Sequence, residues 1–188
     1  MQVDIITYHV FQLLADKLFV RGLENVVKTY RLSHDLNPLS VSAGWIFEYY
    51  CHRIISGDGG RQLSLIPLTL TSSSIRKKTP FKFCRPNRNE EGWSFPLTTR
   101  HRHHFGNEDK LNLSNEEYFI PNQTNKPAYN GFLVAADVND RQHALGFQMT
   151  TKSKHDAKTS GIDDLRGRVG GMPVVFILLV PKEGSMMT

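Results

Sequence analysis

The last third of the chain follows a succession of segment types that few folds accommodate. Residues 128–136 and 144–151 are strand-like and are joined by a polar turn, which predicts an antiparallel hairpin. Residues 156–168 predict a helix, and the continuous apolar run 174–180, followed by Pro181, is typical of a central strand covered on both faces. A hairpin, a helix and a buried strand in this order predict an α/β domain with a small mixed β-sheet flanked by helices.

The first half of the chain predicts two helical regions and several short strands. Apolar residues recur with helical spacing over residues 5–30. The candidate N-caps 40–42 and the glycine-rich run 56–60 predict a second helix over residues 43–55. Residues 63–70 predict one strand or two short ones, and residues 81–83 another. These elements fit the same α/β domain.

The composition excludes several classes of protein. At 188 residues the chain has the length of one domain, so residues 1–188 are expected to form a single one. No apolar run approaches the ~20 residues of a membrane span, and the first residues lack the basic region of a signal peptide, so neither is expected. The two cysteines, of which Cys51 is expected to be buried, provide neither a disulfide framework nor a four-ligand zinc site.

Residues 72–115 are the least regular part of the chain, and they predict an exposed basic segment. The net charge of +5 is compatible with a polyanionic partner, and two basic clusters lie in this segment. Residues 100–104 have the sequence Arg-His-Arg-His-His. Because adjacent histidines in a loop lack the fixed spacing of a metal site, they predict a solvated basic loop. The candidate nucleic-acid-binding residues are Arg76, Lys77, Lys78, Arg100 and Arg102.

Three segments carry polar residues that could form one chemical site. On the predicted helix, Glu48 and His52 lie one turn apart and share a face. An asparagine stands at the start of the hairpin, and the second hairpin strand places Gln, Thr and Lys side chains on one face before a histidine follows. An edge strand with one solvated face would show the same alternation, and periodicity alone favours that interpretation. The candidate site residues are Glu48, Asn130, Gln148, Thr150, Lys152 and His155.

Short motifs around these positions resemble one known family. The run 147–150 (Phe-Gln-Met-Thr), a histidine five residues beyond it, Gly161-Ile162 and an apolar strand closing in Val-Pro look like the C-terminal domain of Crinkler effectors and related retrotransposon-hot-spot-type proteins. Phe47-Glu48 with a histidine and a Gly-Gly pair is similar to the first helix of that family, and residues 127–130 to its first core strand. The resemblance covers residues 5–181.

The resemblance implies a divergent restriction-endonuclease-like fold of the PD-(D/E)xK nuclease superfamily, with an αβββαβ core. It also implies an endonuclease that hydrolyses phosphodiester bonds in DNA with Mg²⁺ or Mn²⁺, within a secreted effector that acts in the nucleus of a host cell. Such proteins usually carry an N-terminal targeting segment and often an NTPase domain. This chain contains no P-loop motif, so it looks like the C-terminal domain alone or a short member of the family.

The resemblance also assigns a metal site. Glu48 matches the acid of the first helix, Asn130 stands where the family usually has a metal-binding aspartate, and Gln148 holds the place of the second acid. These three residues would be the metal ligands. Since Asn130 and Gln148 are neutral and Mg²⁺ prefers anionic oxygen, the affinity for metal is expected to be low.

The remaining site residues follow from the same resemblance. Thr150 occupies the place of the superfamily lysine, Lys152 faces the same side and would supply the cation, and His155 matches the family histidine. Two functions stay open. One is a nuclease impaired by Asn130, and the other is a catalytically inactive effector module that binds host nucleic acid or a host protein. Asn130 fits both a natural pseudo-enzyme and a deliberately inactivated protein. A membrane is not among the expected partners.

Overall fold

The computed structural model describes Leu13, Asp16 and Lys17, and residues 28–30, 40–57, 62–65, 69–70, 83–84, 93–123, 128–136, 140–151 and 158–181. The chain forms two compact units, of which the first comprises Met1–His52, Met149–Lys152 and Val180–Thr188 and the second Arg53–Gln148 and Ser153–Leu179. A five-stranded mixed sheet with a few helices makes the fold α/β, as the sequence predicted. Among the described residues, no helix is long and apolar enough to cross a membrane.

The first unit is organised by helix α3, Ser40–Ile55, most of which belongs to it. The helix begins three residues before the expected start, so residues 40–42 lie inside its first turn rather than ahead of it. Its buried residues include Ala43, Ile46, Phe47 and Tyr50, which follow the i, i+3, i+4, i+7 spacing of one helix face. The ring of Phe47 lies 6.4 Å from that of Tyr30. Of the helix expected over residues 5–30, the described residues are helical and the others lie outside the described part.

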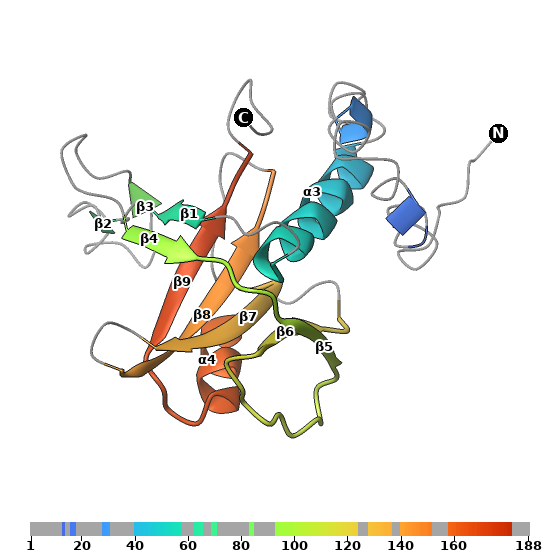
Figure 1. Ribbon diagram of the computed structural model, residues 1–188. Helices are drawn as coiled ribbons and strands as arrows, with labels where there is room; N and C mark the ends of the chain where they lie inside the picture. The colour runs from blue at the N-terminus through green and yellow to red at the C-terminus, as the bar shows by residue number, and fades with distance from the viewer. Residues whose placement is uncertain are drawn as a thin grey trace. The chain divides into compact units, whose positions relative to one another are not determined.

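The second unit contains the sheet in the order β5-β6-β7-β8-β9 (Figure 1). Strand β5 pairs parallel with β6, while β6 with β7 and β7 with β8 are antiparallel, so the predicted hairpin is confirmed. Helix α4 follows β8, and β9 then runs beside β8 in the same direction (Figure 1). The elements are β5 His101–Phe105, β6 Glu117–Pro121, β7 Gly131–Ala136, β8 Gln142–Met149, α4 Thr159–Arg168 and β9 Val174–Leu179.

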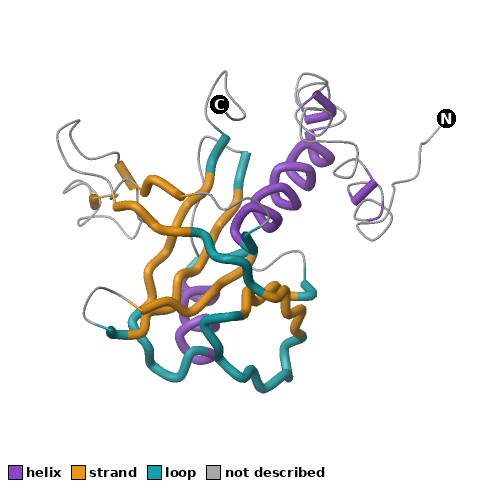
Figure 2. The backbone as a smooth tube through the Cα atoms, in the orientation of Figure 1, coloured by secondary structure: helices purple, strands orange, loops and turns teal. Residues whose placement is uncertain are grey.

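Strand β5 corrects the prediction of an irregular segment over residues 72–115. The Arg-His-Arg-His-His run, expected to be a solvated loop, forms most of an edge strand of the sheet. The reason is the residue that follows: Phe105 is 1% exposed and anchors the polar strand in the core. The parallel partner β6 lies across a loop without regular structure, residues 106–116 (Figure 2).

Strand β9 corrects a second prediction, because it lies at the other edge of the sheet and not at its centre. Of its six residues only Ile177 is buried. Val174 and Phe176 pack against the core, whereas Leu178 is 36% exposed. An unbroken apolar run therefore does not distinguish a central strand from an edge strand that is half covered.

Two small antiparallel sheets precede β5. Strand β1, Gln62–Leu65, pairs with β4, Trp93–Pro96, and β2, Thr69–Leu70, pairs with β3, Phe83–Cys84. The prediction of two short strands over residues 63–70 is confirmed, and the one over residues 81–83 overlaps the described β3 at a single residue.

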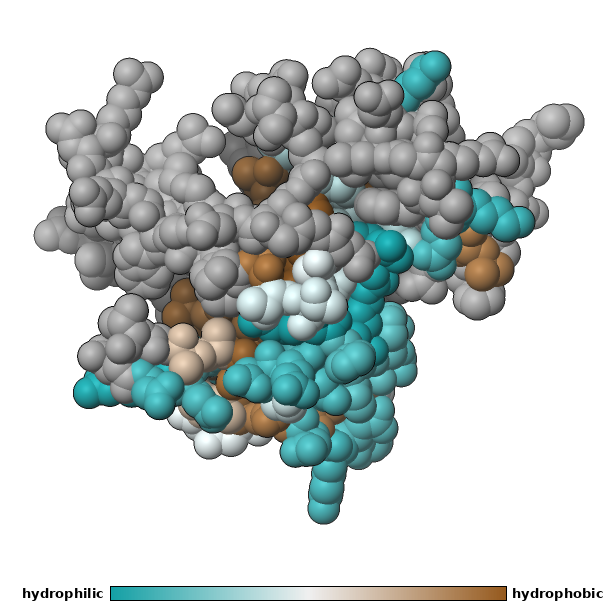
Figure 3. All heavy atoms as spheres, viewed as in Figure 1, coloured by the Kyte–Doolittle hydropathy of each residue, from teal (hydrophilic) through white to brown (hydrophobic). Residues whose placement is uncertain are grey.

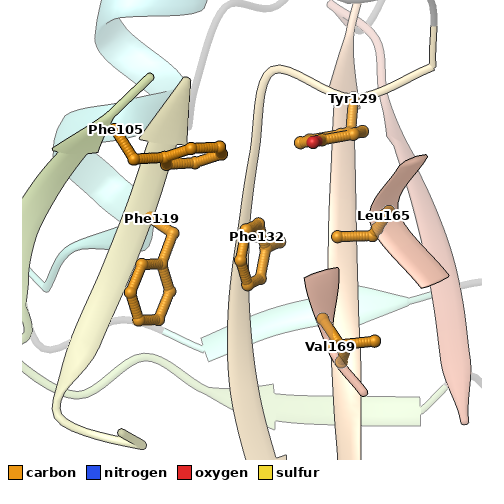
Figure 4. Packing of buried hydrophobic residues seen from close by; sticks show 7 residues of the cluster. Phe105, Phe119, Tyr129, Phe132, Leu165 and Val169 are labelled. Carbon is orange, nitrogen blue, oxygen red and sulfur yellow. The ribbon is translucent and has the colours of Figure 1, made fainter. Parts of the chain in front are cut away.

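An aromatic cluster forms the core of the second unit (Figure 4). The ring of Phe132 in β7 stacks on that of Phe119 in β6, with centroids 4.8 Å apart. The rings of Phe105 and Tyr129 meet Phe132 edge-on at 5.8 and 6.1 Å. Helix α4 contributes Leu165 to the same cluster. Side chains from β5, β6, β7 and α4 thus belong to one buried cluster.

The approach of α4 to β8 depends on Gly146. A Cβ atom at this position would lie 2.8 Å from Leu165 Cδ2 and 3.2 Å from the Phe176 ring. Gly146→Ala is therefore expected to lower the free energy of unfolding by about 1–3 kcal/mol. The matched variant is Gly167→Ala in α4, which has open space around it and should raise that free energy by about 0.5–1 kcal/mol. Urea unfolding measures both; changes of the same sign would contradict this account of the packing.

Candidate functional site

Asn130 and Gln148 meet at the open end of the β7–β8 hairpin. The ladder pairs Gly131 with Phe147, so the next residues outward, Asn130 and Gln148, stand opposite each other. The backbone N–H of Asn130 donates to the carbonyl of Phe147 at 2.7 Å. Gln148 Nε2 donates to Asn130 Oδ1 at 3.0 Å. The structure therefore brings together two of the three residues predicted to hold a metal.

The surroundings of Gln148 correct the simpler interpretation of its strand. Strand β8 lies between β7 and β9, and its residues from Ala144 to Met149 are buried, so it is not an edge strand with one solvated face. Gln148 and Thr150 are 9% and 8% exposed. Burial of a polar side chain is costly unless it is hydrogen-bonded, and the Gln148 amide has Asn130 as a partner.

The chemistry of this pair fits Mg²⁺ poorly. Both side chains are neutral amides, and Mg²⁺ takes hard, preferably anionic oxygen ligands. Gln148 presents its nitrogen, not its oxygen, to Asn130. A cation between them would require the Gln148 amide to turn over. Within the described part of the chain, no group of three His, Cys, Asp or Glu side chains is placed to hold a metal ion.

Glu48 and His52 form the second pair, on α3 in the first unit. His52 Nε2 lies 3.5 Å from Glu48 Oε1, so the predicted shared face is confirmed. The His52 side chain is 6% exposed and that of Glu48 17%. Cys51 beside them is buried as expected, and burial, together with the nearby Glu48 carboxylate, raises the pKa of its thiol. Since Glu48 and Asn130 belong to different units, a shared site stays a prediction.

Five predicted site residues lie outside the described part of the chain. Lys152 and His155 follow β8, and the other three belong to the first basic cluster. Their expected roles stay predictions. They are Arg76, Lys77, Lys78, Lys152 and His155.

Arg100 and Arg102 are placed by contacts within the second unit. The Arg100 backbone N–H donates to the carbonyl of Ser56 at 2.9 Å, and Arg102 Nε donates to Ser56 Oγ at 3.1 Å. The Arg100 side chain also donates to the carbonyls of Asn115 and Thr98 at 3.1 and 3.2 Å. Burial lowers the pKa of Arg100, although a guanidinium stays protonated in proteins. The Arg102 guanidinium thus lies next to the C-terminal end of α3, where positive charge is favourable, whereas the Arg100 guanidinium bonds elsewhere.

The surface around β5 carries mixed charge. Hydrophilic residues gather over β5 and the loop after it (Figure 3). His101 and His104 are exposed, and the loop adds the exposed Glu108, Asp109 and Lys110. This face is polar and carries both basic and acidic groups.

One cluster was not predicted from the sequence. Asp164 Oδ2 on α4 accepts hydrogen bonds from the Tyr129 hydroxyl at 2.5 Å and from Arg168 Nε at 3.2 Å. Burial, followed by the hydrogen bond to Asp164, raises the pKa of Tyr129, so its hydroxyl stays protonated and donates. The i, i+4 spacing of Asp164 and Arg168 is visible in the sequence, but nothing in it links them to Tyr129.

Comparison with known proteins adds no relative. No family model, no curated protein and no solved structure matches this chain. The site must therefore be interpreted from its own geometry.

Proposed function

We propose that this chain is a restriction-endonuclease-like domain that acts on nucleic acid, with hydrolysis impaired by Asn130. The succession of elements supports the proposal. After α3 come the short strands β1 to β4 and the edge strand β5; the chain then builds the antiparallel run β6-β7-β8, crosses through α4 and returns as β9 beside β8. With β1 to β5 counted as additions, the remaining elements follow the αβββαβ order that the resemblance to Crinkler effectors implies.

The observation that carries the proposal is the contact between Asn130 and Gln148. Two positions, 18 residues apart in sequence, that the resemblance assigns to metal ligands are joined by a hydrogen bond of 3.0 Å. An aspartate at position 130 would put one carboxylate at this point. With asparagine there, Glu48 is the one anionic residue among the three expected ligands, so hydrolysis is expected to be weak.

A second candidate function is a binding module without catalysis. It is favoured by the direction of the same hydrogen bond, because Gln148 turns towards Asn130 its amide nitrogen, which is not a ligand for Mg²⁺. Such a module would bind host nucleic acid or a host protein. Under either function, we propose that the protein acts in the nucleus of a host cell.

Plasmid cleavage with Mg²⁺ or Mn²⁺ distinguishes the two functions. The chain as it stands and its Asn130→Asp variant are compared, with EDTA as the control for metal dependence. Metal-dependent cleavage by the variant supports the nuclease. DNA binding without cleavage by either protein supports the binding module.

Binding to nucleic acid is expected to be non-specific and sensitive to salt, and Arg102 offers a test. Arg102→Ala should weaken binding to all sequences alike and reduce the slope of log Kd against log salt by about 1, because one phosphate contact is lost. Ser56→Ala removes one hydrogen-bond partner of Arg102 but keeps the charge of Arg102, so the salt slope should not change. Equal effects of the two substitutions in filter-binding titrations would show that Arg102 serves the fold and not the nucleic acid.

A further inference from the structure

The cluster around Asp164 is held from three elements of the second unit. Arg168, whose side chain is 12% exposed, donates to Asp164 and also to the carbonyls of Gly106 and Asn107, at 3.4 and 3.0 Å. Its guanidinium carbon lies 5.0 Å from the centre of the Phe105 ring, a cation–π contact. Because Arg168 is fixed on several sides, it defines where the Asp164 carboxylate lies.

The carboxylate in turn fixes Tyr129. This residue is 0% exposed, and its ring packs edge-on against Phe132 while its hydroxyl donates to Asp164. A phenylalanine would fill the same space in the core. The hydroxyl of Tyr129 additionally fixes the orientation of the ring, because a buried hydroxyl that lost its hydrogen bond to Asp164 would be unfavourable.

Asn130 is thereby restrained on both sides. The preceding residue, Tyr129, is held by its hydrogen bond to Asp164. After Asn130 stands Gly131, where a Cβ atom would lie 2.8 Å from Tyr118 Cζ and closer still to the hydroxyl oxygen, so the backbone passes directly against that side chain. Between these two restraints, the Asn130 N–H is bonded to the Phe147 carbonyl and its side chain faces Gln148.

We propose that Tyr129 is a positioning residue that, held by Asp164 and Arg168, keeps the side chain of Asn130 within hydrogen-bonding reach of Gln148. This inference rests on the proposed function in one respect, namely that Asn130 and Gln148 belong to the functional site. Tyr129 touches neither metal nor substrate in this scheme and acts through its neighbour in the chain.

The direct test is the side-chain amide of Gln148 in ¹H–¹⁵N spectra of the full chain, assigned by its loss in Gln148→Glu. In Tyr129→Phe, the Gln148 Nε2 resonances are expected to move towards those of exposed glutamines, with amide exchange at least ~10-fold faster, as the hydrogen bond to Asn130 weakens. The matched control is Val169→Ala, which trims another fully buried side chain of the same core cluster and should leave these resonances in place. Unchanged resonances in Tyr129→Phe, or equal changes in the control, would overturn the proposal.

A second variant covers the case in which Tyr129→Phe does not fold. Asp164→Asn keeps the shape and an acceptor oxygen but removes the charge, and it should shift the Gln148 resonances in the same direction by a smaller amount. No shift in a folded Asp164→Asn would equally count against the proposal.

The affinity for Mg²⁺ provides a second, separate measurement. In the Asn130→Asp background, Tyr129→Phe should weaken Mg²⁺ binding by about 10-fold, the scale of losses from groups that orient a ligand. If Asn130→Asp binds no Mg²⁺, the proposed nuclease function fails, while the spectra of Gln148 still decide whether Tyr129 positions Asn130.

Discussion

Asn130→Asp is expected to raise the rate of Mg²⁺-dependent plasmid cleavage by about 100-fold or more. The substitution changes charge and hardly changes shape. A carboxylate at position 130 would still accept the hydrogen bond from Gln148 Nε2, so the hairpin end should keep its geometry. What it adds is one anionic ligand in a half-buried place, where Mg²⁺ is held more strongly than by neutral amides.

Binding of Mg²⁺ to Asn130→Asp should also change the unfolding temperature of this variant. Without Mg²⁺, a half-buried carboxylate lacks a compensating charge, so Asn130→Asp should unfold at a lower temperature than the original chain. Saturating Mg²⁺ should raise that temperature, because a ligand that binds only the folded state stabilises it. The original chain should show little change. Thermal scans with and without EDTA measure this difference.

Two further variants make the experiment specific. Asn130→Ala removes the amide without adding charge and should stay inactive. Lys152→Ala in the Asn130→Asp background should lose about 10²–10³ of the restored rate if this lysine stabilises the developing charge on phosphate. An Asn130→Asp protein that folds, binds DNA and cleaves nothing would rule out the nuclease and leave the binding module.

Gly57→Ala is expected to lower the free energy of unfolding by about 3 kcal/mol, the largest effect on stability among the described glycines. Gly57 follows the end of α3 with a φ of +92°, where an L side chain costs about 1–2 kcal/mol. A Cβ atom would also lie 2.5 Å from Thr99 N and 2.6 Å from the Thr98 carbonyl oxygen, and closer still to Thr99 Cα. These are backbone atoms that cannot rotate away, so the clash adds about 1–3 kcal/mol.

Gly170→Ala is the matched control. Gly170 also has a positive φ, +61°, but no atom of the described residues beyond its chain neighbours comes within 4 Å of the place that a Cβ atom would take. Its substitution should therefore cost only the backbone term, about 1–2 kcal/mol. Urea unfolding of both variants separates conformational strain from close approach. Equal losses would contradict the tight contact between the end of α3 and the segment leading into β5.

The hairpin and the residues it brings together could be predicted because they depend on a local period. Once residues 128–136 and 144–151 pair as neighbours, the ladder places Asn130 opposite Gln148. Strand β5 could not be found in this way, since its five residues include one buried apolar side chain, Phe105. The pairing that orders it comes from β6, across a loop.

The contacts of Tyr129 and Arg102 could not be predicted from the sequence, because they join residues that are far apart in it. Tyr129 and Asp164 are 35 residues apart, and Arg102 and Ser56 are 46 apart. Sequence periodicity does not predict such contacts. The first depends on how α4 packs, and the second on how the end of α3 packs. Arg102 consequently looked like one more charge in a basic run, although its guanidinium donates a hydrogen bond to Ser56 within the fold.

The position of β9 has a consequence for the behaviour of the protein in concentrated solution. In the described sheet β9 has a strand neighbour on one side only, and Val174–Leu179 contains no charge, glycine or proline. Uncharged apolar strands at a sheet edge are templates for pairing with other chains. Pro181 lies just beyond the strand and lacks the N–H that a further ladder bond would need. Pro181 is therefore expected to limit how far an incoming strand could extend along β9, and so to reduce aggregation.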